Sequence, residues 1–140
     1  MAGTVIADNL QAASTSTLVI KNGVASTPPT IQDSAGTEIG TFCRAWVNFN
    51  GTGTVAIRAS FNVSSITDNG TGDYTVNFTN AMPDVNYSMG QSLTSTGTNF
   101  VRYLGIFSKT TSSVRVQSIF AGATTAGFFD YDENNVQIFR

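Results

Sequence analysis

The tetrapeptide Asn-Gly-Thr-Gly occurs twice, at residues 50–53 and 69–72, each time between runs that alternate apolar and polar residues. Asn followed by Gly is the strongest short-range signal for a β-hairpin, because both central residues of a type I′ turn need a positive φ, which Asn tolerates and Gly adopts freely. We therefore predict two hairpins in tandem. The first pairs Arg44–Phe49 with Thr54–Ala59, and the second pairs Phe61–Ile66 with Tyr74–Thr79.

The segment that links the two hairpins alternates without a break. One face would carry Val55, Ile57, Ala59, Phe61 and Val63, and the other Thr54, Ala56, Arg58, Ser60 and Asn62. A period of two places one set on a core and the other in solvent. The sequence therefore predicts a half-buried antiparallel meander.

The remainder of the chain continues the same pattern. Short runs rich in β-branched and aromatic residues recur at Tyr87–Leu93, Phe100–Phe107, Val114–Ala121 and Asn135–Phe139. They are separated by Gly-, Ser- and Thr-rich loops, and no apolar period of 3.6 residues is sustained over three turns. We predict an all-β domain over residues 42–140, an antiparallel β-sandwich or a barrel-like meander, with Phe128–Tyr131 packing as a corner beneath the last strand.

Residues 1–41 differ from the rest of the chain in composition and in the pattern of apolar residues, and they predict an extended N-terminal arm. Small apolar groups, Val5-Ile6 and Leu18-Val19-Ile20, precede Pro28-Pro29, which removes two backbone donors and cannot lie in a central strand. Two small hairpins are expected, Leu18–Lys21 with Val24–Ser26 and Thr30–Gln32 with Glu38–Phe42. A lone two-stranded hairpin is marginal in water, so we expect the arm to lie on another surface.

Charge is scarce, and this bears on partners. Only 11% of the 140 residues are charged and the net charge is −2, against roughly 25% charged residues in ordinary soluble domains. Uncharged β-surfaces favour edge pairing, so we expect the edges to be closed by oligomerisation, the alternative being a monomer that hides them in loops. Scattered basic residues argue against nucleic acid, and no long apolar run or secretion signal indicates a membrane.

The sequence contains few side chains that could catalyse a reaction or bind a metal ion. Histidine is absent and Cys43 is the single cysteine, expected as a buried inert thiol, so catalytic triads and zinc sites are not predicted. Asp130, Asp132 and Glu133 form an acidic cluster that could hold calcium or cleave a glycosidic bond, or simply serve the loop, and Asp68 with Asp73 forms a weaker pair. We predict no enzyme and no cofactor.

The residues from Ala45 to Arg58, AWVNFNGTGTVAIR, followed by SFNVSSITDNG and TGDYTVNF up to Phe78, resemble a module found in virion proteins of tailed bacteriophages. The module is common near the C-terminus of tail-fibre-like proteins and in small structural proteins. The resemblance extends to Tyr87, and residues 88–140 share only the pattern of short strands. It implies a non-enzymatic, homotrimeric virion component made in the cytoplasm of the host bacterium.

The resemblance also implies where the chain makes contacts. Trp46, Phe61, Phe78 and Tyr87 are expected among the anchors of a trimer interface, and the arm residues Val5, Ile6, Leu18, Val19, Ile20, Pro28 and Pro29 are expected to contact the major capsid protein or another virion protein. Fibre proteins carry long shafts ahead of the module, whereas here an arm precedes it, so we expect a capsid decoration (cement) protein. The alternative is a tail-fibre or receptor-binding tip, with the loops Thr94–Asn99, Ser108–Ser113 and Gly122–Asn134 contacting a host glycan.

Overall fold

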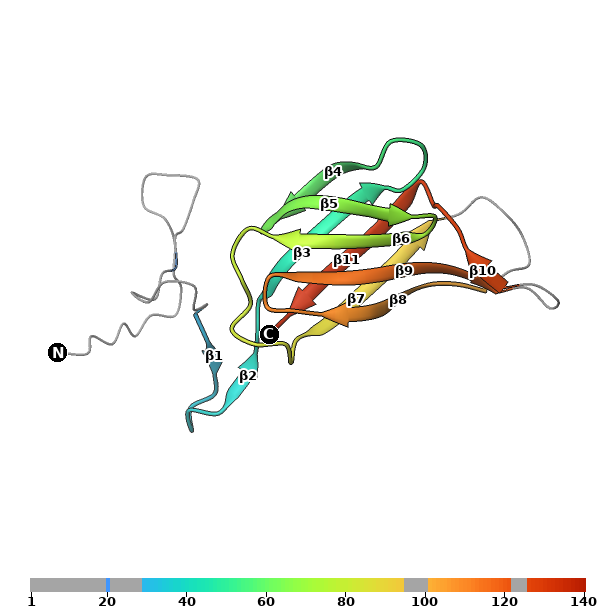
Figure 1. Ribbon diagram of the computed structural model, residues 1–140. Coiled ribbons are helices and arrows are strands. Elements are labelled where there is room, and N and C mark those ends of the chain that lie inside the picture. Colours follow the sequence, from blue (N-terminus) through green and yellow to red (C-terminus); the bar gives the residue numbers. More distant parts are fainter. Residues whose placement is uncertain (1–19, 21–28, 95–100, 122–125) are drawn as a thin grey trace, which may run out of the picture.

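Two antiparallel sheets pack face to face in the computed structural model, which describes residues 20, 29–94, 101–121 and 126–140 (Figure 1). The strands are β1 (Ile31–Gln32), β2 (Glu38–Gly40), β3 (Cys43–Asn50), β4 (Ala56–Phe61), β5 (Val63–Gly70), β6 (Asp73–Phe78), β7 (Ser88–Thr94), β8 (Val101–Lys109), β9 (Ser113–Ala121), β10 (Ala126–Phe128) and β11 (Glu133–Phe139). The described residues contain no helix. The predicted all-β antiparallel fold is confirmed, and it is a sandwich.

The first sheet has the order β4-β3-β11-β7. In the second sheet β9 is central. One side of β9 pairs with β8, and its other side pairs first with β6 and then with β10. The strand β5 pairs with the free side of β6. The predicted strands from residue 87 onward are all present, and no end differs from its predicted position by more than two residues. Of the corner predicted at 128–131 only Tyr131 is buried, whereas Phe128, at the end of β10, and Phe129 are exposed.

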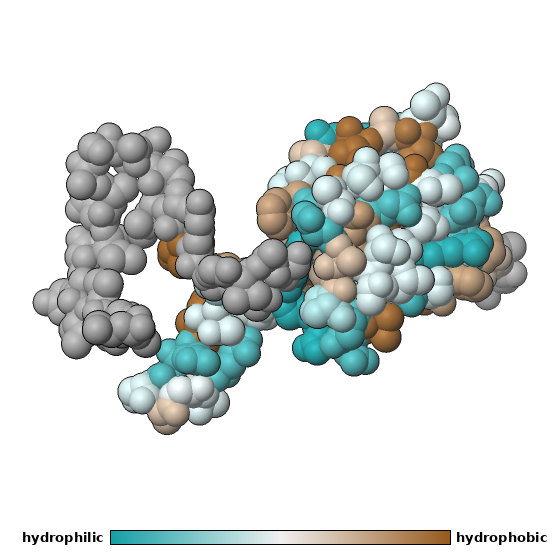
Figure 2. Space-filling view, turned by 60° about the vertical axis from the view of Figure 1, so that its left-hand side comes forward, coloured by the Kyte–Doolittle hydropathy of each residue, from teal (hydrophilic) through white to brown (hydrophobic). Residues whose placement is uncertain are grey.

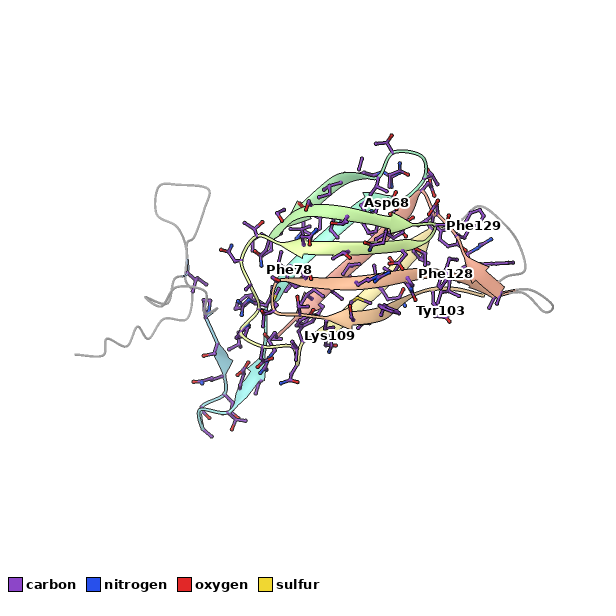
Figure 3. The ribbon with its side chains drawn as sticks, in the orientation of Figure 1. Asp68, Phe78, Tyr103, Lys109, Phe128 and Phe129 are labelled. Carbon is purple, nitrogen blue, oxygen red and sulfur yellow. The ribbon has the colours of Figure 1, made fainter. Side chains whose placement is uncertain are left out.

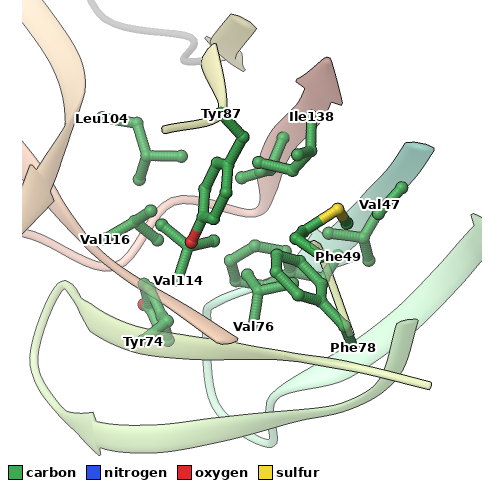
Figure 4. Packing of buried hydrophobic residues seen from close by; sticks show 13 residues of the cluster. Val47, Phe49, Tyr74, Val76, Phe78, Tyr87, Leu104, Val114, Val116 and Ile138 are labelled. Atoms are coloured by element: carbon green, nitrogen blue, oxygen red, sulfur yellow. The ribbon is translucent and has the colours of Figure 1, made fainter. Parts of the chain in front are cut away.

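The core lies between the sheets and is built by strict alternation (Figure 4). In β6 the side chains of Tyr74, Val76 and Phe78 point inward while the residues between them face solvent. Tyr74 meets Phe49 of β3 edge to face, with ring centroids 5.1 Å apart. Full burial of each large apolar side chain contributes about 1.5–3 kcal/mol, so this interior accounts for the cohesion of the two sheets.

Both tandem hairpins form, but their turn type was wrong, and Phe61, predicted to begin the second hairpin, ends β4 of the first. β3 pairs with β4 and β5 pairs with β6, yet neither Asn50 nor Asn69 has a positive φ, which is found instead at Gly53, Gly70 and Gly72. The Asn side chains serve the turns differently: Asn50 Oδ1 accepts from the Thr52 amide at 3.2 Å. A side-chain hydrogen bond to the local backbone therefore replaces the left-handed Asn that a type I′ turn requires.

The predicted continuous meander is wrong, because β4 and β5 belong to different sheets. The register shifts where Asn48 opposes Ala59 but Phe49 opposes Ile57, which leaves Arg58 as an extra residue in a β-bulge. A bulge reverses the inside–outside alternation, so Ala59 and Phe61 point away from the core that Val55 and Ile57 contact.

The chain changes sheet at Asn62, whose φ is 55°. Its side chain fixes the corner by donating to the carbonyls of Arg44 at 3.0 Å and Asn80 at 3.1 Å, and by accepting from the Asn80 amide at 2.7 Å. Asn adopts the left-handed region more readily than most residues, because its short polar side chain can bond locally. Val63 resumes the core-facing pattern on the second sheet.

The hairpin β1–β2 confirms the predicted pairing of Thr30–Gln32 with Glu38–Phe42. Figure 1 shows it standing away from the sandwich, beside the end where β3 begins and β11 finishes. Its turn is held by Asp33, whose Oδ1 accepts from the amides of Ala35 and Thr37, each at 2.9 Å. The other predicted hairpin, Leu18–Lys21 with Val24–Ser26, lies outside the described residues apart from Ile20.

Candidate interaction surfaces

The end of the sandwich that faces away from the hairpin is closed by hydrogen bonds around Tyr74. The Tyr74 hydroxyl donates to Asp130 Oδ1 at 2.6 Å, and the Gly72 amide donates to the same oxygen at 2.6 Å. Burial raises the pKa of Tyr74 well above its usual range, and the hydrogen bond to Asp130 raises it further. Asp130 therefore ties the loop before β11 to the turn between β5 and β6.

A second set of buried polar groups continues this closure. Asn134 Nδ2 donates to the Tyr131 carbonyl at 2.9 Å, while Asn134 Oδ1 accepts from the Ser118 hydroxyl at 3.2 Å. The Gly51 amide also donates to the Tyr131 carbonyl at 2.9 Å. Sequence reasoning missed Ser118 and Asn134, because a polar residue in an alternating strand carries no mark that it points inward.

The acidic cluster does not converge on one point. Asp130 is engaged at the closed end of the sandwich, Asp132 is exposed, and Glu133 accepts from Asn48 Nδ2 at 3.0 Å and from Asn135 Nδ2 at 3.2 Å. The Asn135 hydrogen bond is the largest of the influences that lower the pKa of Glu133. Among the described residues no three Asp, Glu or Cys side chains are grouped so as to hold a metal ion. Amide and hydroxyl groups donate to the carboxylates of Asp130 and Glu133.

The outer face of the first sheet carries exposed aromatic side chains, and we call Trp46, Phe61 and Phe139 the aromatic face. Trp46 of β3 and Phe61 of β4 are directly opposite each other across the strands, and Gln137 of β11 opposes Trp46 from the other side. Trp46 is 38% exposed and Phe61 55% exposed. Trp46 lies on an inner strand of its sheet, so neither a strand edge nor a loop accounts for its exposure.

The outer face of the second sheet is polar at its centre. Arg115 of β9 makes a bidentate ion pair with Asp73 of β6, through Nε and Nη2, each at 2.7 Å, and Gln117 Nε2 donates to Asp73 at 3.0 Å. The hydrogen bond from Arg115 lowers the pKa of Asp73 to about 2, against the opposing effect of burial. This side chain is only 13% exposed, so the pair is shielded from solvent better than an ordinary surface salt bridge.

Apolar side chains gather at one end of this second face. Tyr103, Ile119 and Phe128 form a row across β8, β9 and β10, and the first and last of them are exposed. Phe107, beside a register shift in β8, lies against the Arg115 guanidinium at 4.6 Å from its ring centroid. Figure 3 shows Tyr103, Phe128 and Phe129 at the end of the molecule opposite the hairpin.

The four residues predicted as trimer anchors fall into two classes. Phe78 and Tyr87 are 7% and 2% exposed, and their rings meet edge to face in the core of the single chain at 5.9 Å. Trp46 and Phe61 lie together on the aromatic face. Phe78 and Tyr87 therefore present no surface to a second chain, and the predicted interface depends on Trp46 and Phe61.

Most of the residues predicted to make the arm contacts lie outside the part of the chain that the structure describes. Val5, Ile6, Leu18, Val19 and Pro28 lie outside the described residues, whereas Ile20 is exposed and Pro29 half-buried. Cys43, expected as a buried thiol, is half-buried, and its Sγ lies 3.2 Å from the Ala45 carbonyl. Ile31 and Ile39, in the described part of the arm, and Phe42, directly after it, are all exposed.

Comparison with known proteins identifies no relative. No protein-family model matches the chain, and neither a curated protein nor a solved structure matches it. The part of the chain that the structure describes contains no helix long and apolar enough to cross a membrane.

Proposed function

We propose that this protein is a non-enzymatic structural component of a tailed-bacteriophage virion, a decoration protein that binds the assembled capsid as a homotrimer and stabilises it. The protein acts by binding and catalyses no reaction. Its exposed apolar surfaces and its arm make the contacts. The protein is made in the bacterial cytoplasm, and in the finished virion it is bound to the capsid surface. Support comes from the resemblance of residues 45–78 to a virion module and from the surfaces that the folded chain leaves uncovered.

One observation carries the proposal. The hairpin β1–β2 consists of strands of two and three residues whose apolar side chains are exposed, with Ile39 at 64%. Such a hairpin has too little buried area to be stable in water by itself. Figure 2 shows the hairpin projecting from the domain, with a surface that is mostly teal and white on this side. A covering partner supplies the missing stability, as expected for a chain that works within an assembly.

The stabilising effect follows from linkage. A protein that binds the assembled lattice but not the free capsid subunits shifts the equilibrium towards the lattice. Three linked copies strengthen this effect, since contacts held at high effective concentration exceed a single contact by around 10²–10⁴ in affinity. Weak contacts from each arm to the major capsid protein are then sufficient.

The copy number per virion tests the proposal. Densitometry of stained gels of purified particles compares this protein with the major capsid protein. We expect a number close to that of the capsid subunits. In addition, deleting residues 2–40 should abolish binding to capsids that lack the protein, while Tyr103→Ala, a change at the opposite end, should leave binding intact. A deletion variant that binds as well as the full chain would refute the decoration role of the arm.

The second candidate is a tail-fibre or receptor-binding tip, and a specific observation favours it. Tyr103, Phe128 and Phe129 are exposed at the end opposite the hairpin, within or beside the segments predicted to contact a glycan. Aromatic rings with a polar surround can stack on sugar rings. A copy number far below that of the capsid subunits, with loss of adsorption to host cells in Tyr103→Ala, would favour this function over decoration.

A further inference from the structure

The chain leaves several groups of apolar side chains uncovered, and two of these groups are the hairpin β1–β2 and the aromatic face. The hairpin β1–β2 presents Ile31 and Ile39, which are 43% and 64% exposed. The aromatic face presents Trp46, Phe61 and Phe139 at 38%, 55% and 39% exposure. For side chains of this size these fractions amount to on the order of 300 Å² of apolar surface, as large as the main apolar patch of a typical monomer.

The hairpin is directed away from the aromatic face of its own chain. Only Thr41 and Phe42 separate β2 from β3, and two extended residues span about 7 Å. The Thr41 hydroxyl donates to the Arg140 carbonyl at 3.2 Å, and Arg140 is itself paired with Asp84 at 2.6 Å. These contacts hold the linker at the end of the sandwich, where β3 begins. Folding the hairpin back over Trp46 would require a full reversal within that short, tethered link.

Charge favours contact between the two surfaces of different copies. Residues 29–42 contain Asp33 and Glu38 and no Lys or Arg, and both carboxylates are exposed. Arg58 is exposed at the bulge of β4, three residues before Phe61. Glu133, which lies near Arg58, already accepts hydrogen bonds from Asn48 and Asn135. An acidic hairpin and an aromatic face bordered by arginine are therefore complementary in both polarity and charge.

We propose that the hairpin β1–β2 of one copy packs on the aromatic face of the next copy, with Ile31 and Ile39 against Trp46 and Phe61 and with Glu38 near Arg58. Hairpin and face are different surfaces, so the contact is heterologous, and it closes into a ring when each copy gives one hairpin and receives another. A ring of three is the homotrimer of the proposed function, on which this inference rests. Each hairpin gains the cover that it lacks in the single chain.

Cross-linking between engineered cysteines tests the contact. In a Cys43→Ser background, one chain carries Gln32→Cys on the hairpin and another carries Ala59→Cys beside Phe61, two exposed positions that leave the apolar anchors in place, and the two are mixed with a short bis-maleimide. We expect covalent dimers from the mixture on denaturing gels, and closed trimers from a chain that carries both substitutions. The matched control replaces Ala59→Cys by Phe128→Cys, an exposed position at the far end of the sandwich, and should give at least tenfold less product.

Sedimentation equilibrium separates this inference from the proposed function. Ile39→Glu should shift the protein from trimer to monomer without loss of the far-ultraviolet signal of the sandwich, since the hairpin contributes no residue to the core. A trimer that gives no more cross-linked product between positions 32 and 59 than the control would overturn the inference and leave the trimer standing. A protein that is monomeric at every concentration would overturn both. Efficient cross-linking in a ring that does not bind capsids would overturn only the decoration function.

Discussion

Removal of one hydroxyl group should measure how strongly the end of the sandwich is closed. Tyr74→Phe keeps the ring, which is fully buried against Phe49, and deletes the hydrogen bond of 2.6 Å to Asp130. A hydrogen bond to a charged group contributes about 1.5–3 kcal/mol. Asp130 keeps the Gly72 amide and is half-buried, so water can replace part of the lost donor. We therefore expect the free energy of unfolding to fall by about 2 kcal/mol.

Urea unfolding followed by far-ultraviolet circular dichroism measures this loss, with an unchanged denaturant slope showing that the folded state is intact. Tyr103→Phe is the matched control, because the same hydroxyl is removed from an exposed ring. Combining Tyr74→Phe with Asp130→Asn gives a double-mutant cycle, whose coupling energy should exceed about 1 kcal/mol. If Tyr74→Phe is as stable as Tyr103→Phe, the hydrogen bond does not hold this end together and the reasoning fails.

The same group predicts behaviour at alkaline pH. The folded-state pKa of Tyr74 is raised by burial above its unfolded value, and burial likewise raises the pKa of Tyr87 to about 12. A raised pKa stabilises the folded state fully below the unfolded pKa of about 10, and this stability is lost as the pH rises above that value. The wild-type protein should therefore lose stability above about pH 10, and Tyr74→Phe should lose less over the same range.

Three further predictions concern the turns, the acid range and the exposed rings. Gly72→Ala should lower the free energy of unfolding by roughly 2–3 kcal/mol or more, because φ is +66° and a Cβ would lie 2.7 Å from the backbone of the loop after β10. The matched control is Gly53→Ala, where φ is +63° and the space is open. This change should cost only about 1 kcal/mol, measured by thermal unfolding. Asp73→Asn should flatten the fall in the free energy of unfolding between about pH 4 and pH 2. The lowered pKa of the Asp73 carboxyl group stabilises the folded state above the unfolded-state pKa, and this contribution is lost as the pH falls towards the folded-state pKa. Acid titration followed by circular dichroism checks this. Phe78→Ala should cost about 3–5 kcal/mol of unfolding free energy, whereas Phe61→Ala should cost less than about 1 kcal/mol in the isolated chain and act on self-association instead.

Local patterns were sufficient wherever neighbouring residues decide the structure. The hairpins around Asn50-Gly51 and Asn69-Gly70 and the hairpin Thr30–Phe42 lie where turn residues interrupt alternating runs. Their exact turn geometry depended on hydrogen bonds that the pattern does not reveal, such as the one that Asn50 accepts from the amide of Thr52. The acidic cluster was equally visible, but the destination of Asp130 was not, because its partners Tyr74 and Gly72 are far away in the chain.

The sequence by itself determined that this chain forms antiparallel strands and where most of them begin and end, since alternation and turn chemistry act over a few residues. Only the tertiary structure decided which sheet each strand joins and which side chains face outward. The bulge at Arg58 is defined by pairing with β3, and the corner at Asn62 by hydrogen bonds to Arg44 and Asn80. These nonlocal contacts reverse the alternation before Phe61, and they are the reason that Phe61 lies on the surface while Phe78, from a similar run, lies in the core.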